Sequence, residues 1–232
     1  RRGRGAGLGC DGGLAEYMVV PSPRLTVPLD GLDPVTAAPL ADAGLTPYHA
    51  IRRVARALGP GTSAIVIGVG GLGHVAVQLL KALGSVRVVA VDRRDEALEV
   101  ATRSGADAVL HAGVTVDELR RAAGGRGAAL VVDCVGSDET LALAAGAVAA
   151  GGHVSVLGLA GGTFPMRFGG VPLETSVIFS NWGTRAELAE VVALARDGAI
   201  ELEIERVPLR GVPAAYERLA RGAGRGRLVA VP

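Results

Sequence analysis

The chain is poor in cysteine, has one lysine and lacks any long uncharged apolar run. Only Cys10 and Cys134 are present in 232 residues, so neither a disulfide framework nor a zinc site made of cysteines is expected. No apolar run reaches about 18 residues, which argues against a transmembrane helix. A net charge of +1 gives no electrostatic reason to expect nucleic acid or membrane as a partner. These features predict a globular protein in a reducing, cytoplasmic compartment.

A glycine-rich turn follows the apolar run 65–67 and leads into an amphipathic segment. Gly68, Gly70 and Gly73 match the G-x-G-x-x-G pattern of dinucleotide-binding proteins. The first glycine permits the tight turn, the second lets the backbone approach a pyrophosphate, and the third lets the helix pack close to its strand. The phosphates then face free N–H groups at a helix N-terminus, where the helix dipole favours negative charge.

An acidic residue stands where this pattern requires one. The next apolar run, 86–91, ends at Asp92, which is 19 residues after Gly73. An acid at this place hydrogen-bonds the adenosine ribose hydroxyls and repels a 2′-phosphate. NAD is therefore expected in preference to NADP, although Arg93 and Arg94 partly offset the repulsion. The alternative is that Asp92 is the N-cap of the following helix.

Apolar runs and amphipathic segments alternate through the middle of the chain. The alternation is typical of a parallel sheet with right-handed crossovers. Six such runs predict an α/β fold with a doubly wound six-stranded Rossmann sheet. The expected strands are 64–68, 86–91, 108–110, 129–134, 153–157 and 175–180, and the expected helices are 71–83, 94–104, 115–123 and 137–149.

Both ends of the chain follow other patterns. Residues 1–9 are expected to form a loop, and the C-terminal part is too small to bury a core of its own, so it should pack on another part. The remaining expected elements are a short strand at 13–20, extended pieces at 25–29 and 203–209, helices after Asp33 and over 46–58, 185–197 and 212–220, and a final strand at 227–231.

Four segments together resemble the zinc-dependent medium-chain alcohol dehydrogenases: residues 13–21, 41–50, 68–73 and 226–229. In that family a coenzyme domain is inserted into a split, mainly β catalytic domain. The resemblance also implies that about 100 residues, roughly one domain, precede this chain in a complete protein.

The resemblance implies three parts of the chain. Residues 1–43 correspond to the end of the N-terminal, GroES-like catalytic portion. Residues 44–183 correspond to the dinucleotide-binding domain, and residues 184–232 correspond to the return into the catalytic domain.

The resemblance also implies roles for single residues. Asp42 stands at the family's last catalytic zinc ligand, and a carboxylate is a competent ligand; a helix cap is the alternative. Thr46 matches the residue that packs on the nicotinamide, or is simply a first-turn threonine. Trp182 walls the substrate pocket, or serves the core or a subunit interface. Arg227 matches an arginine that reaches the cofactor phosphates. The implied catalytic residues are Asp42, Thr46 and Trp182, with Asp42 the metal ligand, and the implied cofactor-binding residues are Thr46, Gly68, Gly70, Gly71, Leu72, Gly73, Asp92, Arg93, Val135, Leu157, Leu159 and Arg227.

Three further residues have side chains of types that often take part in catalysis or binding. His49 lies within an expected helix and is interpreted as structural. His74 either approaches the cofactor diphosphate or is an ordinary first-turn residue. Cys134 is expected to be a small buried apolar residue.

The resemblance implies an oxidoreductase that transfers a hydride between an alcohol and NAD, giving an aldehyde or ketone. A catalytic zinc would polarise the substrate oxygen. The implied partner is a small-molecule alcohol or carbonyl compound, and a homo-oligomer is expected. Asp42 is the only expected zinc ligand here, so the chain alone is expected to be inactive. Two alternatives stay open: a zinc-free quinone or enone reductase of the same superfamily, and a non-catalytic nucleotide-binding remnant.

Overall fold

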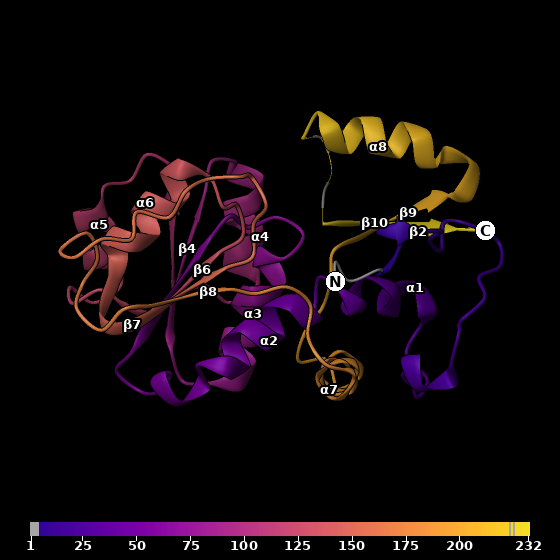
Figure 1. Ribbon diagram of the computed structural model, residues 1–232, viewed down its shortest axis with the longest axis horizontal. Helices are drawn as coiled ribbons and strands as arrows, with labels where there is room; N and C mark the ends of the chain where they lie inside the picture. Colours follow the sequence, from indigo (N-terminus) through magenta and orange to yellow (C-terminus); the bar gives the residue numbers. More distant parts are fainter. Residues whose placement is uncertain (1–4, 223, 225) are drawn as a thin grey trace.

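The computed structural model describes residues 5–222, 224 and 226–232. A six-stranded parallel sheet forms its larger part, in the order β5-β4-β3-β6-β7-β8 (Figure 1). The strand order reverses between β3 and β6, and such a reversal marks the ligand-binding edge of doubly wound sheets. The strands are β3 (Ser63–Ile67), β4 (Arg87–Asp92), β5 (Ala108–His111), β6 (Ala128–Asp133), β7 (Val148–Val156) and β8 (Ser176–Phe179).

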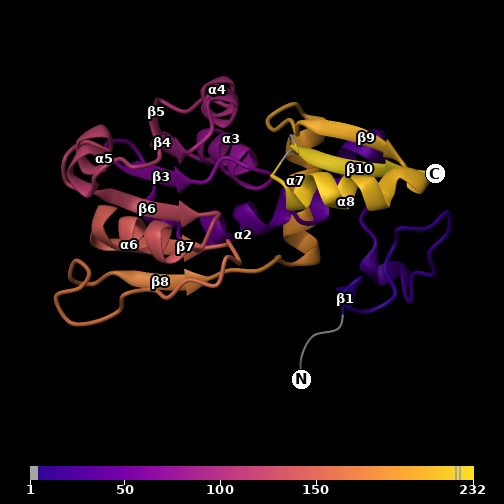
Figure 2. The same ribbon diagram turned by 90° about the horizontal axis from the view of Figure 1, so that it is seen from above.

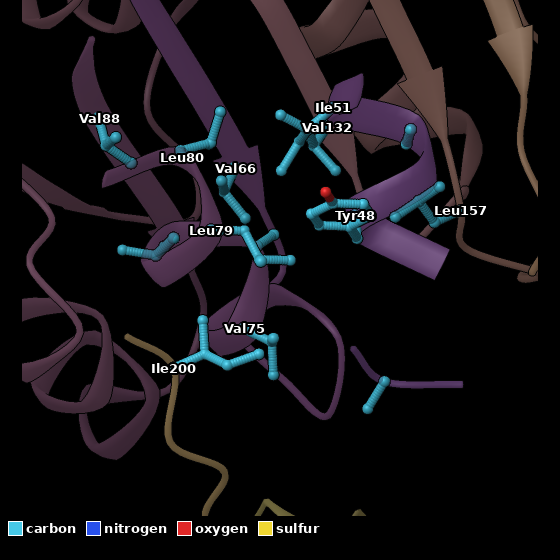
Figure 3. Close-up of a cluster of buried hydrophobic side chains, with 14 of the residues drawn as sticks. Tyr48, Ile51, Val66, Val75, Leu79, Leu80, Val88, Val132, Leu157 and Ile200 are labelled. Carbon is cyan, nitrogen blue, oxygen red and sulfur yellow. The ribbon is translucent and has the colours of Figure 1, made fainter. Parts of the chain in front are cut away.

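Helices pack on both faces of this sheet. One face packs against α2 (Leu45–Arg53), α3 (Gly73–Leu83) and α4 (Asp95–Arg103), and the other against α5 (Val116–Ala122) and α6 (Asp138–Ala147). Every residue of β3 is buried, as expected for a parallel strand covered on both sides. Figure 3 shows side chains of α2 and α3 meeting those of the strands in the first of these cores, with Ile51, Leu79 and Val66 among them.

The remaining elements lie at the other end of the molecule (Figures 1 and 2). β9 (Ile204–Pro208) and β10 (Arg227–Val231) pair in parallel, and α8 (Val212–Ala220) connects them. The helix α7 (Arg185–Arg196) packs on α2, where the His49 Nδ1 lies 2.9 Å from a carboxylate oxygen of Glu187. His49 therefore links α2 to α7, a contact that agrees with its interpretation as a structural residue.

Apart from α2, residues 5–60 contain little regular structure. The short helix α1 (Pro34–Ala37) is capped by Asp33, whose carboxylate accepts a hydrogen bond from the Thr36 N–H at 3.3 Å. The other elements here are the two-residue strands β1 (Gly5–Ala6) and β2 (Gly9–Cys10) and 3₁₀ turns at Pro23–Leu25, Ala38–Ala41 and Ala55–Ala57; a fourth such turn, Leu209–Gly211, precedes α8.

The doubly wound α/β prediction is confirmed, with three local corrections. The expected strand at 13–20 is wrong: no strand forms there, and Tyr17 and Val19 are 91% and 88% exposed. Residues of high β-propensity form a strand only beside a pairing partner, and none lies alongside this segment in the described part of the chain. The expected helix 46–58 ends as an α-helix at Arg53.

The third correction concerns the fifth strand of the sheet. The expected helix 137–149 ends at Ala147, and β7 starts at Val148 rather than at residue 153. A register irregularity opposite Ala128 and Leu130 absorbs the extra residues. The glycines at 151 and 152 therefore lie inside an irregular strand instead of preceding a regular one.

Two expectations concern more than single elements. The division of the chain at residues 43/44 and 183/184 stays a prediction. The expected loop at 1–9 begins outside the described residues, since the structure describes the chain from Gly5. Among the described residues, no helix has both the length and the apolar character needed to cross a membrane.

Candidate functional site

A cleft of about 810 Å³ lies at the carboxyl ends of β3, β4 and β6. This is the edge at which the strand order reverses, where doubly wound sheets bind their ligands. The turn after β3 forms its floor, and the end of β4 and the start of α6 form its sides. The expected cofactor residues that line it are Gly68, Gly70, Gly71, Leu72, Asp92, Arg93 and Val135.

The glycine turn has the geometry that its pattern predicts. Gly68 has a φ of +86°, and a Cβ there would lie 2.6 Å from a methyl group of Val135. A Cβ on Gly73 would lie 1.9 Å from the carbonyl oxygen of Gly68. At Gly70, by contrast, a Cβ would meet no other atom within 4 Å. The first and third glycines therefore permit close packing, while the second leaves space for a ligand to approach the backbone.

Asp92 is oriented by the turn that it faces. It is 9% exposed, and one carboxylate oxygen accepts a hydrogen bond from the Val69 N–H at 2.7 Å. The other oxygen accepts from the Arg94 N–H at 3.0 Å and lies 3.4 Å from the Arg94 Nε. The N-cap position of α4 belongs to Arg94, so Asp92 is not that cap. The oxygen that accepts from Val69 keeps a second lone pair, and Asp92 lines the cleft.

Three other expected site residues meet beside the glycine turn. The Arg227 guanidinium donates to one carboxylate oxygen of Asp42 at 2.9 Å. The Thr46 hydroxyl donates to the other at 3.3 Å. Arg227 also lies directly over Gly71, where a Cβ would be 2.9 Å from its Cδ. The expected zinc ligand and the expected phosphate-binding arginine thus form an ion pair. The N-cap of α2 is Gly44, so the capping alternative for Asp42 does not hold.

The residues present fit a dinucleotide better than a zinc ion. A catalytic zinc requires three protein ligands, and no group of three histidine, cysteine or acidic side chains in the described residues could hold a metal. Asp42 is the one expected ligand, and both of its oxygens already accept hydrogen bonds. The open space over Gly70, at the N-terminus of α3, matches a pyrophosphate instead.

Some expected residues lie away from the cleft. Leu157 is buried in the hydrophobic core, whereas Leu159 is 95% exposed. Trp182 has a left-handed φ of 55° and lies near Gly5, outside the cleft. Cys134 does line the cleft and is only half-buried, so it is less enclosed than expected. Burial raises the pKa of its thiol far above the ordinary value, which keeps it protonated and a poor nucleophile.

A second wall of the cleft was not predicted from the sequence. It is formed by the N-terminal ends of α5 and α6, which contribute Thr115, Ser137, Glu139 and Thr140. Thr115 and Ser137 each open a capping box. Their spacing marks the start of a helix, but it carries no information about which other segment that start will face.

Comparison with known proteins places these features in one family. Residues 71–197 match the model of the zinc-binding dehydrogenase family. An NAD-dependent alcohol dehydrogenase of Sulfurisphaera tokodaii is 35% identical over 99% of this chain and 67% of its own length. A D-arabinose 1-dehydrogenase (NADP⁺) of Saccharolobus solfataricus is 34% identical over 96% of this chain and 65% of its own length.

Solved structures agree with the sequence relatives. The alcohol dehydrogenase of Aeropyrum pernix superposes with a TM-score of 0.86 at 35% identity, over 97% of this chain and 67% of that one. The acetophenone reductase of Geotrichum candidum, solved with NAD, gives a TM-score of 0.77 at 31% identity, over 88% of this chain and 57% of that one. This chain therefore spans about two thirds or less of its relatives. From the glycine turn to α7 it matches the family model, and it belongs to the zinc-binding dehydrogenases, the medium-chain alcohol dehydrogenase family that its motifs resemble.

Proposed function

We propose that this chain binds NAD in the cleft at the glycine turn and supplies the cofactor-binding part of an alcohol oxidoreductase. The observation that carries the proposal is the position of Asp92 beside the turn, at the edge where the strand order reverses. Relatives named NAD-dependent alcohol dehydrogenases support it.

Different residues of the cleft would bind different parts of NAD. The pyrophosphate would lie against the backbone of Gly70 and Gly71, at the N-terminus of α3. Asp92 would accept hydrogen bonds from the adenosine ribose hydroxyls, and Val135 would pack beside the cofactor. When bound, NAD supplies a nicotinamide carbon that accepts a hydride from an alcohol carbon. Thr46 is proposed to pack against that ring.

The proposed role of these residues does not include metal chemistry. Asp42 as a zinc ligand remains a prediction, since its carboxylate is held here by Arg227 and Thr46. What the chain itself provides is the orientation of the cofactor. Alcohol as the substrate class is part of the proposal, and a homo-oligomer remains an expectation.

The cofactor preference tests the proposed role of Asp92. Loss of a hydrogen bond to a charged group costs about 1.5–3 kcal/mol, so Asp92→Ser should weaken NAD binding by about tenfold to a hundredfold. NADP binding should weaken less or improve, because the repulsion of a 2′-phosphate is removed. Calorimetric titration with both cofactors gives the ratio of the two dissociation constants.

The matched control is Asp95→Ser in the first turn of α4, whose side chain is 89% exposed. For this variant, the ratio of the NAD and NADP dissociation constants should equal that of the unmodified chain. Because Asp92 also holds the Val69 N–H, the unfolding midpoint of each variant is measured in parallel. Tighter binding of NADP than NAD by the unmodified chain, or an unchanged ratio in a folded Asp92→Ser variant, would contradict the proposal.

A further inference from the structure

Glu203 joins three separate elements just before β9. Its backbone N–H donates to the His74 Nε2 at 3.4 Å, and its carbonyl oxygen accepts from the Arg227 N–H at 2.8 Å. Its carboxylate accepts from Arg103 of α4 at 2.6 Å. Glu203 therefore connects the first turn of α3 to the strand that carries Arg227.

His74 connects Glu203 to the glycine turn. The side chain is 2% exposed, and its Nδ1 lies 2.8 Å from the carbonyl oxygen of Gly70. A carbonyl oxygen only accepts, so Nδ1 must carry the proton, and the unprotonated Nε2 then accepts from the Glu203 N–H. Both partners of the imidazole are satisfied by this one neutral tautomer.

Arg227 links Glu203 to the glycine turn at the cleft. Its side chain lies over Gly71, next to the residue whose carbonyl binds His74. A closed ring of contacts thus runs from Gly70 through His74, Glu203 and Arg227 to Gly71. We propose that His74 is a positioning residue for the cofactor: it holds Glu203 so that Arg227 stays over the glycine turn. This inference rests on the proposed binding of NAD in the cleft.

A substitution of Gln78 distinguishes this role from simple docking of the C-terminal segment on α3. Gln78 lies one helical turn after His74 on α3, and its amide makes two hydrogen bonds of 2.7 Å to the backbone of Glu201. These bonds hold the same segment but do not reach the glycine turn. Gln78→Leu is therefore the matched control for loss of docking alone.

A double-mutant cycle tests the proposal on the complete 232-residue chain, with the dissociation constant of NAD measured by calorimetry. His74→Asn keeps a donor near the position of Nδ1 and loses the acceptor for Glu203. One lost neutral hydrogen bond corresponds to about 0.5–1.5 kcal/mol, so NAD should bind about twofold to tenfold more weakly. In an Arg227→Ala background the same change should have no further effect, because coupled residues are not additive.

Two other variants complete the test. His74→Gln keeps an acceptor near the position of Nε2, so its NAD affinity should stay within about twofold of the unmodified chain, and it carries the test if His74→Asn does not fold. Gln78→Leu should lower the unfolding midpoint and leave NAD affinity unchanged.

Three outcomes would overturn the role of His74. They are an equal loss from His74→Asn with and without Arg227, a loss in His74→Gln as large as that in Arg227→Ala, and a loss in Gln78→Leu as large as that in His74→Asn. Failure of the unmodified chain to bind NAD would instead overturn the proposed function.

Discussion

Single residues determine how closely α3 approaches the glycine turn. Gly73→Ala would place a Cβ 1.9 Å from the backbone oxygen of Gly68, which has no flexible side chain to move aside. We expect a loss of at least about 2 kcal/mol in the free energy of unfolding, measured with urea, because overpacking typically costs about 1–3 kcal/mol or more. Gly59→Ala is the control, since no atom lies within 4 Å of its Cβ. A Gly73→Ala variant as stable as this control would contradict the packing role.

At the scale of an element, α7 depends on its first turn. The Thr184 hydroxyl accepts a hydrogen bond from the Glu187 N–H at 3.2 Å, and the Glu187 carboxylate accepts one from the Thr184 N–H at 2.7 Å. The same carboxylate binds His49 of α2. Thr184→Ala should therefore cost about 0.5–2 kcal/mol of unfolding free energy, the usual effect of losing an N-cap.

The control for this prediction is Thr102→Ala on α4. Among the described residues its hydroxyl bonds only to the Leu98 carbonyl within its own helix, so its loss should change the unfolding free energy by less than about 0.5 kcal/mol. Equal effects at Thr184 and Thr102 would show that the cap does not stabilise α7.

At the scale of the whole molecule, the buried His74 makes stability depend on pH. Burial lowers the pKa of His74 below its ordinary value of 6.5, and the hydrogen bond to Gly70 opposes this only in part. The unfolded chain then binds the proton more readily than the folded chain does. The contribution of the neutral His74 to the free energy of unfolding is fully present above about pH 6.5. It is lost as the pH drops from there toward the folded-state pKa, by at most about 1.4 kcal/mol per pH unit for one proton.

Urea unfolding at several pH values between 5 and 8 measures this contribution. All other ionisable groups are common to the two proteins, so the informative quantity is the difference between the unmodified chain and His74→Asn. That difference should shrink as the pH falls below 6.5. A difference that is independent of pH would mean that His74 stays neutral in both states or protonates equally in both.

Short stretches of sequence were enough to predict the sheet and the floor of its cleft. Apolar runs of three to six residues located the six strands, and the spacing of Gly68, Gly70 and Gly73 located the turn between β3 and α3. Asp92 was found in the same way, because the end of a strand and its distance from the turn are both local properties. The helix boundaries near Arg53 and Ala147 were less accurate, because tertiary packing decides where a helix ends.

Only the tertiary structure decided which distant residues meet at the site. Asp42 and Arg227 are 185 positions apart and form an ion pair, and His74 reaches Glu203 across 129 positions. No periodicity or turn pattern encodes such a contact, since it depends on how α3, β9 and β10 pack together. The strand expected at 13–20 failed for the related reason that strand formation requires a neighbour. The sequence by itself thus determined the fold and its dinucleotide motif, whereas the packing of remote segments determined partners such as those of Asp42 and His74.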